Sequence, residues 1–307
     1  MNQNKPMGGT ELMKDWLITR LEKNKANLLK KTQILLFDEK PKINKKNILW
    51  LHDLPNDKRL QHLRDKQTLQ KYKKIVFVSH WQQFLFNAYL HLPYGKGVVI
   101  QNSIDPISIH DKPKEGKINV CYFSTPHRGL EVLLNAWEIL QNNKELRDKI
   151  ELNIYSSFKI YNRPDREKEV EHLYAKAKKM NNVNYNETIT NKQIRQMLKS
   201  QHIMAYPSIY EETSCLCLIE AMSSGCLSVI PNFGALPETS ANFARMYGYQ
   251  EDKTIHAEVH ANVLKKAIEN YWTKDTQTHL RRQVDYFHNF YNWESRITEW
   301  EKLVKSI

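Results

Sequence analysis

Glu212 and Glu220 form a pair of carboxylates with seven residues between them. Ionised carboxylates bind vicinal hydroxyl groups well, at roughly 1.5–3 kcal/mol for each charge-assisted hydrogen bond. Between the two glutamates lie the backbone N–H groups of Thr213, Ser214, Cys215 and Leu216, where a helix is expected to begin, and a helix N-terminus favours a phosphate. The stretch therefore predicts a site for a ligand with both hydroxyl and phosphate groups.

The elements that must position this pair follow from the neighbouring residues. A strand is expected to end at Tyr206, because a proline and a serine break the apolar run there. A helix is predicted over 214–224, stopped by a glycine, and Cys226–Ile230 is the next predicted strand. Ligands of open parallel sheets bind beyond the carboxyl ends of strands, which is where this geometry would place Glu212.

The same stretch resembles the motif of glycosyltransferase family 4, also called glycosyl transferases group 1. That motif has two glutamates with seven residues between them, then a helix of small residues and a glycine followed shortly by valine; here Gly225-Cys-Leu-Ser-Val229 follows. The resemblance implies that Glu212 contacts the donor sugar as a catalytic residue, that Glu220 binds the ribose, and that the amides near 214–216 hold the diphosphate. It also implies an α/β fold of the GT-B type, with two Rossmann-like domains, parallel sheets and an interdomain cleft.

Two N-terminal segments extend the resemblance. Gly8-Gly9-Thr10-Glu11 opens the first predicted helix, and two glycines let a backbone approach a phosphate or sugar closely. It resembles the family's glycine loop, which implies donor binding by Gly8 and Gly9; a plain turn is the alternative. His52 is predicted at the carboxyl end of a strand, and the resemblance implies that it orients the transferred sugar or the β-phosphate. A structural histidine is the alternative there.

The segment Ser124-Thr-Pro-His-Arg128-Gly129 follows a predicted strand and opens a helix. Most members of the family that it resembles carry an arginine just after this strand and a lysine before the glycine, both on the diphosphate. Arg128 takes the lysine position and suits a phosphate, whereas Ser124 stands at the arginine position. We consider Lys159 as a substitute for the second cation. Residues 184–188 would lie beside the base, by position in the family.

Short apolar runs predict strands over 33–37, 47–51, 74–79, 97–101, 118–123, 150–155, 203–206 and 226–230. Helical patterns predict helices over 11–24, 130–141, 191–200 and 292–307, the last with Trp293, Ile297 and Trp300 on one stripe. This alternation is typical of parallel sheets flanked by helices. A polar segment over 105–117, with two prolines and a glycine, marks a boundary. We expect an acceptor-side Rossmann-like domain over 1–108, a nucleotide-sugar-binding domain over 109–288, and a last helix within 289–307 that could cross back to the first domain. The N-terminal domain is expected to be reduced, because residues 1–7 are too short and polar to form the strand that usually precedes the glycine loop.

The net charge of +12 is concentrated at the start of the chain. Residues 1–75 hold 18 Lys+Arg against 8 Asp+Glu, which leaves +10 there. Such an excess attracts anionic partners, of which lipid headgroups and a phosphorylated acceptor rank above nucleic acid, since aromatic residues are not interleaved with the lysines in a stacking pattern. A solvated surface is the alternative. We find neither a spanning apolar run nor a signal peptide, so we expect a cytoplasmic protein, with peripheral membrane binding as an option.

The resemblance implies a retaining transfer from a UDP- or GDP-linked sugar to an acceptor hydroxyl, without a metal or another cofactor. The sequence carries no D-x-D motif and no carboxylate cluster near strand ends. Amides and Arg128 would then meet the charge on the departing diphosphate. The acceptor could be a glycan, a lipid or a protein. A sugar-nucleotide epimerase or phosphorylase of the same fold, or a non-catalytic sugar-nucleotide-binding module, is the alternative to a hexosyltransferase-like enzyme.

Overall fold

The computed structural model describes residues 9–161 and 163–307, without the side chains of 22–28 and 161. The described residues divide into two compact units. An N-terminal unit contains Gly9–Asp105, Glu212–Leu216 and Phe290–Ile307, and a C-terminal unit contains Pro106–Glu211 and Cys217–Asn289. Among the described residues, none of the helices combines the length and the apolar character that crossing a lipid bilayer requires.

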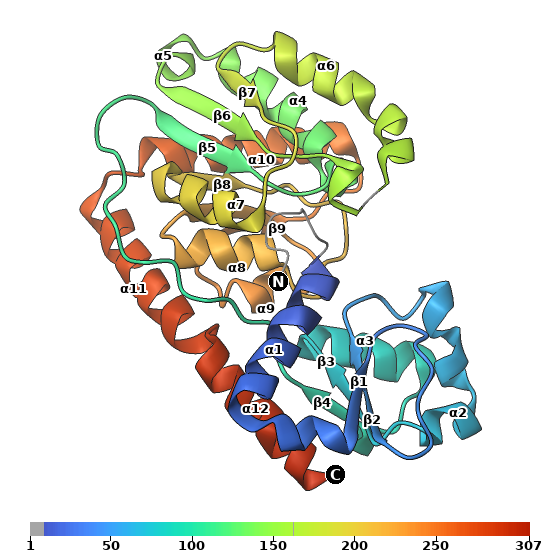
Figure 1. The fold of residues 1–307 in the computed structure, drawn as a ribbon. Coiled ribbons are helices and arrows are strands. Elements are labelled where there is room, and N and C mark those ends of the chain that lie inside the picture. The colour runs from blue at the N-terminus through green and yellow to red at the C-terminus, as the bar shows by residue number, and fades with distance from the viewer. Residues whose placement is uncertain (1–8, 162) are drawn as a thin grey trace. The chain divides into compact units, whose positions relative to one another are not determined.

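A parallel sheet in the order β1-β2-β3-β4 forms the centre of the N-terminal unit (Figure 1). Its strands are β1 (Thr32–Leu35), β2 (Lys46–Leu51), β3 (Lys74–Phe77) and β4 (Gly97–Val99). Most residues of β1 to β3 are buried, which explains why these strands are nearly continuous apolar runs in the sequence. In the described part of this unit, which begins at Gly9, no strand precedes the first helix.

Helices from both ends of the chain cover the N-terminal sheet. They are α1 (Gly9–Lys30) and α12 (Trp293–Ser306), which lie side by side in Figure 1, with α2 (Lys66–Gln70) and α3 (His80–Leu90) elsewhere in the unit. Trp293 meets Trp16 of α1 edge to face at 6.2 Å between ring centres, and Trp300 meets Trp50 of β2 at 4.9 Å. The tryptophan stripe of the last helix is therefore part of this unit's core.

The C-terminal unit is built on a parallel sheet in the order β10-β9-β8-β5-β6-β7. The strands are β5 (Ile118–Tyr122), β6 (Ile150–Ile154), β7 (Val183–Tyr185), β8 (Ile203–Ala205), β9 (Leu227–Asn232) and β10 (Arg245–Gly248). The helices are α4 (Leu130–Gln141), α5 (Lys144–Arg147), α6 (Glu171–Lys179), α7 (Asn191–Met197), α8 (Leu216–Ser223), α9 (Leu236–Thr239), α10 (Lys253–Glu269) and α11 (Lys274–Phe290).

The order of these strands creates a switch point between β5 and β8. From β5 the chain proceeds through β6 to β7 at one edge, and from β8 it proceeds through β9 to β10 at the other. Because such crossovers are right-handed, the two halves place their helices on opposite faces, as α4 and α8 show in Figure 1. Sheets of this kind bind ligands beyond the carboxyl ends of the strands at the switch point.

The structure differs from the sequence-based expectation at some element boundaries. α8 begins at Leu216, not at Ser214. The strands β7 and β10 were not expected, because each is a short edge strand that is largely half-exposed or exposed and shows no continuous apolar run.

A buried histidine pair on α10 has the four-residue spacing of some metal ligands. His256 Nε2 lies 2.8 Å from the hydroxyl of Tyr247, and His260 Nδ1 lies 3.0 Å from the same hydroxyl. Burial lowers the pKa of His256 to about 4 and that of His260 to about 3, so both rings are neutral at pH 7. The pair thus holds a core tyrosine. Across the described ranges, no three His, Cys, Asp or Glu side chains gather as a metal site.

Candidate functional site

The loops after β5 and β8 meet at the switch point of the C-terminal unit. The guanidinium carbon of Arg128 lies 4.4 Å from the ring centre of Tyr210, and the backbone oxygen of Arg128 accepts a hydrogen bond from the amide of Ile209 at 3.2 Å. Ser124 Oγ lies 3.5 Å from the hydroxyl of Tyr206. The cation predicted to bind phosphate is therefore held on an aromatic face beyond the end of β5, where this fold class binds its ligands.

Gly129 lets these two loops approach each other. Its φ is +130°, and a Cβ atom placed there would lie 2.2 Å from the backbone oxygen of Pro207. Only glycine fits, because both the backbone conformation and the space exclude a side chain. The position of Arg128 thus depends on the residue that follows it.

We expect Gly129→Ala to destabilise the protein by about 3 kcal/mol, from a backbone clash added to an unfavourable φ. Gly116→Ala is the matched control, because Gly116 also has a positive φ, +86°, but its Cβ would meet nothing within 4 Å. Urea unfolding of both variants measures the difference. Equal losses in the two variants would show that the contact with Pro207 is not restrictive.

His127 is a neighbour of Arg128 that the sequence-based reasoning did not assign to the site. Its ring stacks on Phe158 with 5.3 Å between ring centres, and burial lowers its pKa to about 4, helped by the charges of Arg128 and Arg166. Its Nδ1 atom is buried and makes no hydrogen bond to the residues that the structure describes. His127 is thus a neutral imidazole whose Nδ1 atom makes no hydrogen bond to the described residues. It lies next to Arg128, the residue predicted to bind phosphate.

Glu220 is buried on α8, with 5% of its surface exposed. Its Oε1 atom accepts hydrogen bonds from Asn191 Nδ2 at 2.9 Å and from Arg195 Nη1 at 3.4 Å. Burial raises the pKa of the carboxyl group, while the charge of Arg195 and the bond from Asn191 act in the opposite direction. No hydrogen bond reaches Oε2 from the described residues. One oxygen is therefore fixed in place and the other is left to accept from a ligand.

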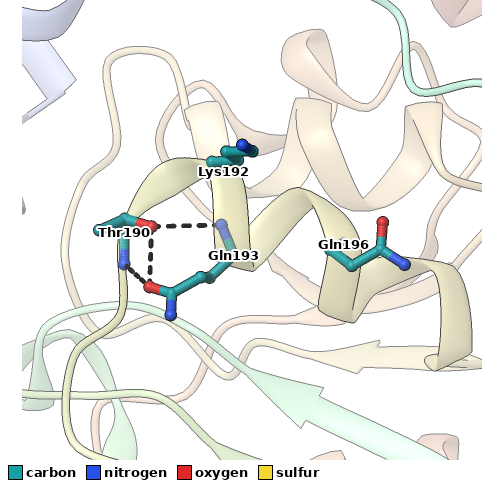
Figure 2. Close-up of a pocket in the computed structure, with 4 residues that line it drawn as sticks. All are labelled: Thr190, Lys192, Gln193 and Gln196. Atoms are coloured by element: carbon teal, nitrogen blue, oxygen red, sulfur yellow. Dashed lines mark hydrogen bonds between the residues drawn. The ribbon is translucent and has the colours of Figure 1, made fainter. Parts of the chain in front are cut away.

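Asn191 and Arg195 hold the carboxylate of Glu220, and the sequence-based reasoning did not identify either of them. They lie four residues apart on a predicted helix, so they share a face, and that spacing could have identified them. A capping box between Thr190 and Gln193 fixes the start of α7, as Figure 2 shows. A hollow of about 480 Å³ adjoins this helix, and none of the predicted site residues lines it; its lining is Thr190, Lys192, Gln193 and Gln196.

The other predicted donor residues belong to the N-terminal unit. Thr213 Oγ1 donates to the backbone oxygen of His52 at 2.5 Å, and a Cβ atom on Gly9 would lie 3.1 Å from Leu216 Cδ1. The structure thus brings the loop before α8 together with the start of α1 and the end of β2. Glu212, Thr213 and Cys215 are buried there, and Ser214 is half-buried. Gly8 lies outside the described residues.

His52 follows β2, with its ring centre 4.6 Å from that of Trp50. Burial lowers its pKa to about 3, so the ring is neutral at pH 7. Its Nε2 atom is buried without a hydrogen-bond partner among the described residues. Such an atom can bind a ligand hydroxyl or phosphate oxygen, but the ring does not supply a positive charge.

Lys159, considered as a second phosphate ligand, is engaged on the surface. Its Nζ atom lies 2.6 Å from Glu187 Oε2, and both side chains are about half exposed. The hydrogen bond to Glu187 raises the pKa of Lys159. Arg128 therefore remains the best-placed cation of those predicted.

Comparisons with known proteins identify the family and the fold of this chain. The family described as glycosyl transferases group 1 matches residues 109–284. No curated protein matches the chain. Among solved structures, HepE of Anabaena in complex with UDP-glucose has a TM-score of 0.68 at 15% identity, over 86% of this chain and 73% of HepE.

Two further structures share the fold. A glycosyltransferase from Rickettsia africae has a TM-score of 0.68 at 15% identity, over 97% of this chain and 82% of its own. Sucrose-phosphate synthase from Thermosynechococcus elongatus has a TM-score of 0.65 at 14% identity, over 96% of this chain and 78% of the synthase. Because the family match spans more than half of the chain, this protein belongs to the glycosyl transferases group 1 family and is a glycosyltransferase with the GT-B fold.

Proposed function

We propose that this enzyme belongs to family 4 and transfers a sugar from a UDP- or GDP-linked donor to an acceptor hydroxyl, with retention of configuration and without a metal. The acceptor is a glycan, a lipid or a protein. HepE of Anabaena was solved with UDP-glucose and with UDP and glucose, which supports a nucleotide sugar as the donor here.

The hydrogen bonding of Glu220 is the observation that carries this proposal. A buried carboxylate with one oxygen held by Asn191 and Arg195 can present the other to two vicinal hydroxyls without reorganising. Ribose offers such a pair of hydroxyls. Burial disfavours the charged carboxylate of Glu220 while the site is empty. The same low-dielectric surroundings strengthen each hydrogen bond that the carboxylate makes to a bound ligand.

The remaining residues would then serve the leaving group and the sugar. Negative charge builds on the departing diphosphate, where Arg128 and the amides of 213–216 would stabilise it. Glu212 and the neutral His52 would orient the sugar. The acceptor hydroxyl would attack on the face of the leaving group, and a diphosphate oxygen would take its proton, so that no side chain need act as a strong base.

A donor screen followed by turnover tests the proposal. We expect one or more nucleotide sugars to raise the melting temperature, because a ligand that binds only the folded state stabilises it. With that donor and a panel of acceptors, release of nucleoside diphosphate should require an acceptor and should be unchanged by EDTA. Proton NMR should show the same anomeric configuration in donor and product. Isomerisation of the donor without an acceptor would refute the transfer reaction. Loss of activity with EDTA would refute metal independence, and inversion of the anomeric configuration would refute retention.

The charge of the first quarter of the chain supports a second proposal, which is peripheral binding to an anionic membrane. This binding would be electrostatic and would weaken as salt concentration rises. It is independent of the donor chemistry.

A further inference from the structure

Every strand of the N-terminal sheet is directly preceded by, or begins with, a lysine. The strands are parallel and neighbours in the order β1-β2-β3-β4, so their first residues lie along one edge of the sheet. Lysine clusters that are separate in the sequence therefore meet in space. We call this row the amino edge, and its lysines are Lys31, Lys42, Lys45, Lys46, Lys71, Lys73, Lys74 and Lys96.

Backbone hydrogen bonds hold these segments together. The amide of Lys46 donates to the oxygen of Lys31 at 2.8 Å, and the amide of Lys73 donates to the oxygen of Asn47 at 2.8 Å. The oxygens of Lys42 and Lys71 both accept from the side-chain amide of Asn47, at 2.9 and 3.3 Å. The row is thus fixed by the sheet and does not depend on flexible chain segments.

The side chains of the row fall into two groups. Lys74 Nζ donates to the oxygen of Gly95 at 2.7 Å, and Lys96 Nζ donates to the oxygen of Tyr72 at 2.6 Å. Burial lowers the pKa of Lys96, and the charges of Lys73 and Lys74 add to that shift, which reflects how close these lysines lie. Lys46 Nζ donates to the backbone oxygen of Ile307. Lys31, Lys42, Lys71 and Lys73 are exposed, and within the described residues no amino-edge lysine forms a salt bridge with an Asp or Glu side chain.

Two large apolar side chains stand among these lysines. Ile43 lies between Lys42 and Lys45 and is fully exposed, and Tyr94 lies two residues before Lys96 with 81% of its surface exposed. Apolar side chains without a partner, set among cations, are typical of surfaces that enter the headgroup region of a membrane. Sites that bind nucleic acid use aromatic rings that stack on the bases, so the aliphatic side chain of Ile43 would not contribute to the binding of a nucleic acid.

We propose that the amino edge docks on an anionic lipid surface, with the exposed lysines on the headgroups and with Ile43 and Tyr94 at the boundary with the acyl chains. This inference deepens the proposed membrane binding by naming its surface. Lys46 begins β2 and His52 follows its end, so the two lie roughly 15–20 Å apart along the strand. Docking of the amino edge would leave the opposite edge of the sheet, where His52 lies, in water and accessible to the donor.

The test replaces the exposed lysines together. We choose Lys31→Gln, Lys42→Gln, Lys71→Gln and Lys73→Gln, because these four side chains are exposed and make no hydrogen bond to the described residues. The matched control carries Lys114→Gln, Lys149→Gln, Lys179→Gln and Lys274→Gln, which are exposed residues of the C-terminal unit with the same change in charge. Sedimentation with vesicles of phosphatidylcholine and phosphatidylserine, and with phosphatidylcholine alone, measures binding at low and high salt.

We expect binding to the anionic vesicles alone, falling with salt. The amino-edge variant should bind about fivefold more weakly for each lysine removed, and the control within about twofold of wild type. Ile43→Ser with Tyr94→Ser should weaken binding further at any salt. Equal loss in both quadruple variants, equal binding to neutral vesicles, or binding only to an RNA oligonucleotide would overturn the proposal. Donor-dependent release of nucleoside diphosphate should be unchanged in the amino-edge variant, which separates this outcome from failure of the donor chemistry.

Discussion

Arg128→Ala is expected to lower kcat roughly 100- to 1000-fold while the protein stays folded. Charge accumulates on the diphosphate only as the glycosidic bond breaks, so a cation placed there acts mainly on the transition state. Arg128 is suited to this role because its guanidinium is held over Tyr210 at the end of β5. Single-turnover rates with saturating donor would measure the effect.

Two further variants separate charge from structure. Arg128→Lys keeps the charge but loses the planar fork, so it should recover part of the lost rate. Arg282→Ala removes an exposed arginine from α11 and should leave kcat within about twofold. An Arg128→Ala enzyme that is folded and retains half of the wild-type kcat would exclude Arg128 from the leaving-group site.

Glu220→Ala is expected to raise the Kd for nucleoside diphosphate about tenfold to a hundredfold. The expected loss of about 1.5–3 kcal/mol is the value of one charge-assisted hydrogen bond from the carboxylate to the ribose hydroxyls. Glu220→Gln keeps the shape and one acceptor oxygen, so its Kd should fall between those of wild type and Glu220→Ala. Calorimetric titration of each variant gives these values.

A ligand change makes this prediction specific to the ribose. A 2′,3′-dideoxynucleoside diphosphate lacks both hydroxyls, so wild type and Glu220→Ala should bind it with similar affinity. The exposed Glu258→Ala is the control for removal of a carboxylate, and it should not alter either Kd. If Glu220→Ala weakens binding of the dideoxy ligand as much as that of the normal one, the carboxylate does not contact the ribose.

Much of the fold could be predicted from the sequence, because parallel strands that are buried on both faces appear in the sequence as nearly continuous apolar runs. The core strands β2, β3, β5 and β6 were expected within a few residues of their ends, and α4 was expected over the range where it lies. The edge strands β7 and β10 were not, since half-exposed residues leave no such run. The stripe of Trp293, Ile297 and Trp300 predicted a docked last helix, and the structure buries all three.

The chemistry of the site was less accessible to sequence reasoning. Glu220 was predicted as a ligand, but its partners Asn191 and Arg195 come from a helix 25 or more residues earlier, and only the fold brings them to its Oε1 atom. The neutral state of His52 depends on burial, which motif spacing does not reveal. Likewise, the lysine clusters of the first quarter form one row only because β1 to β4 are parallel neighbours.

A crystal structure with the nucleoside diphosphate of the preferred donor tests the central claim most directly. The account predicts that the ribose hydroxyls lie within about 3.2 Å of Glu220 Oε2, while Asn191 and Arg195 stay on Oε1. The diphosphate should lie against Arg128. A nucleotide bound with its ribose away from Glu220 would contradict the account.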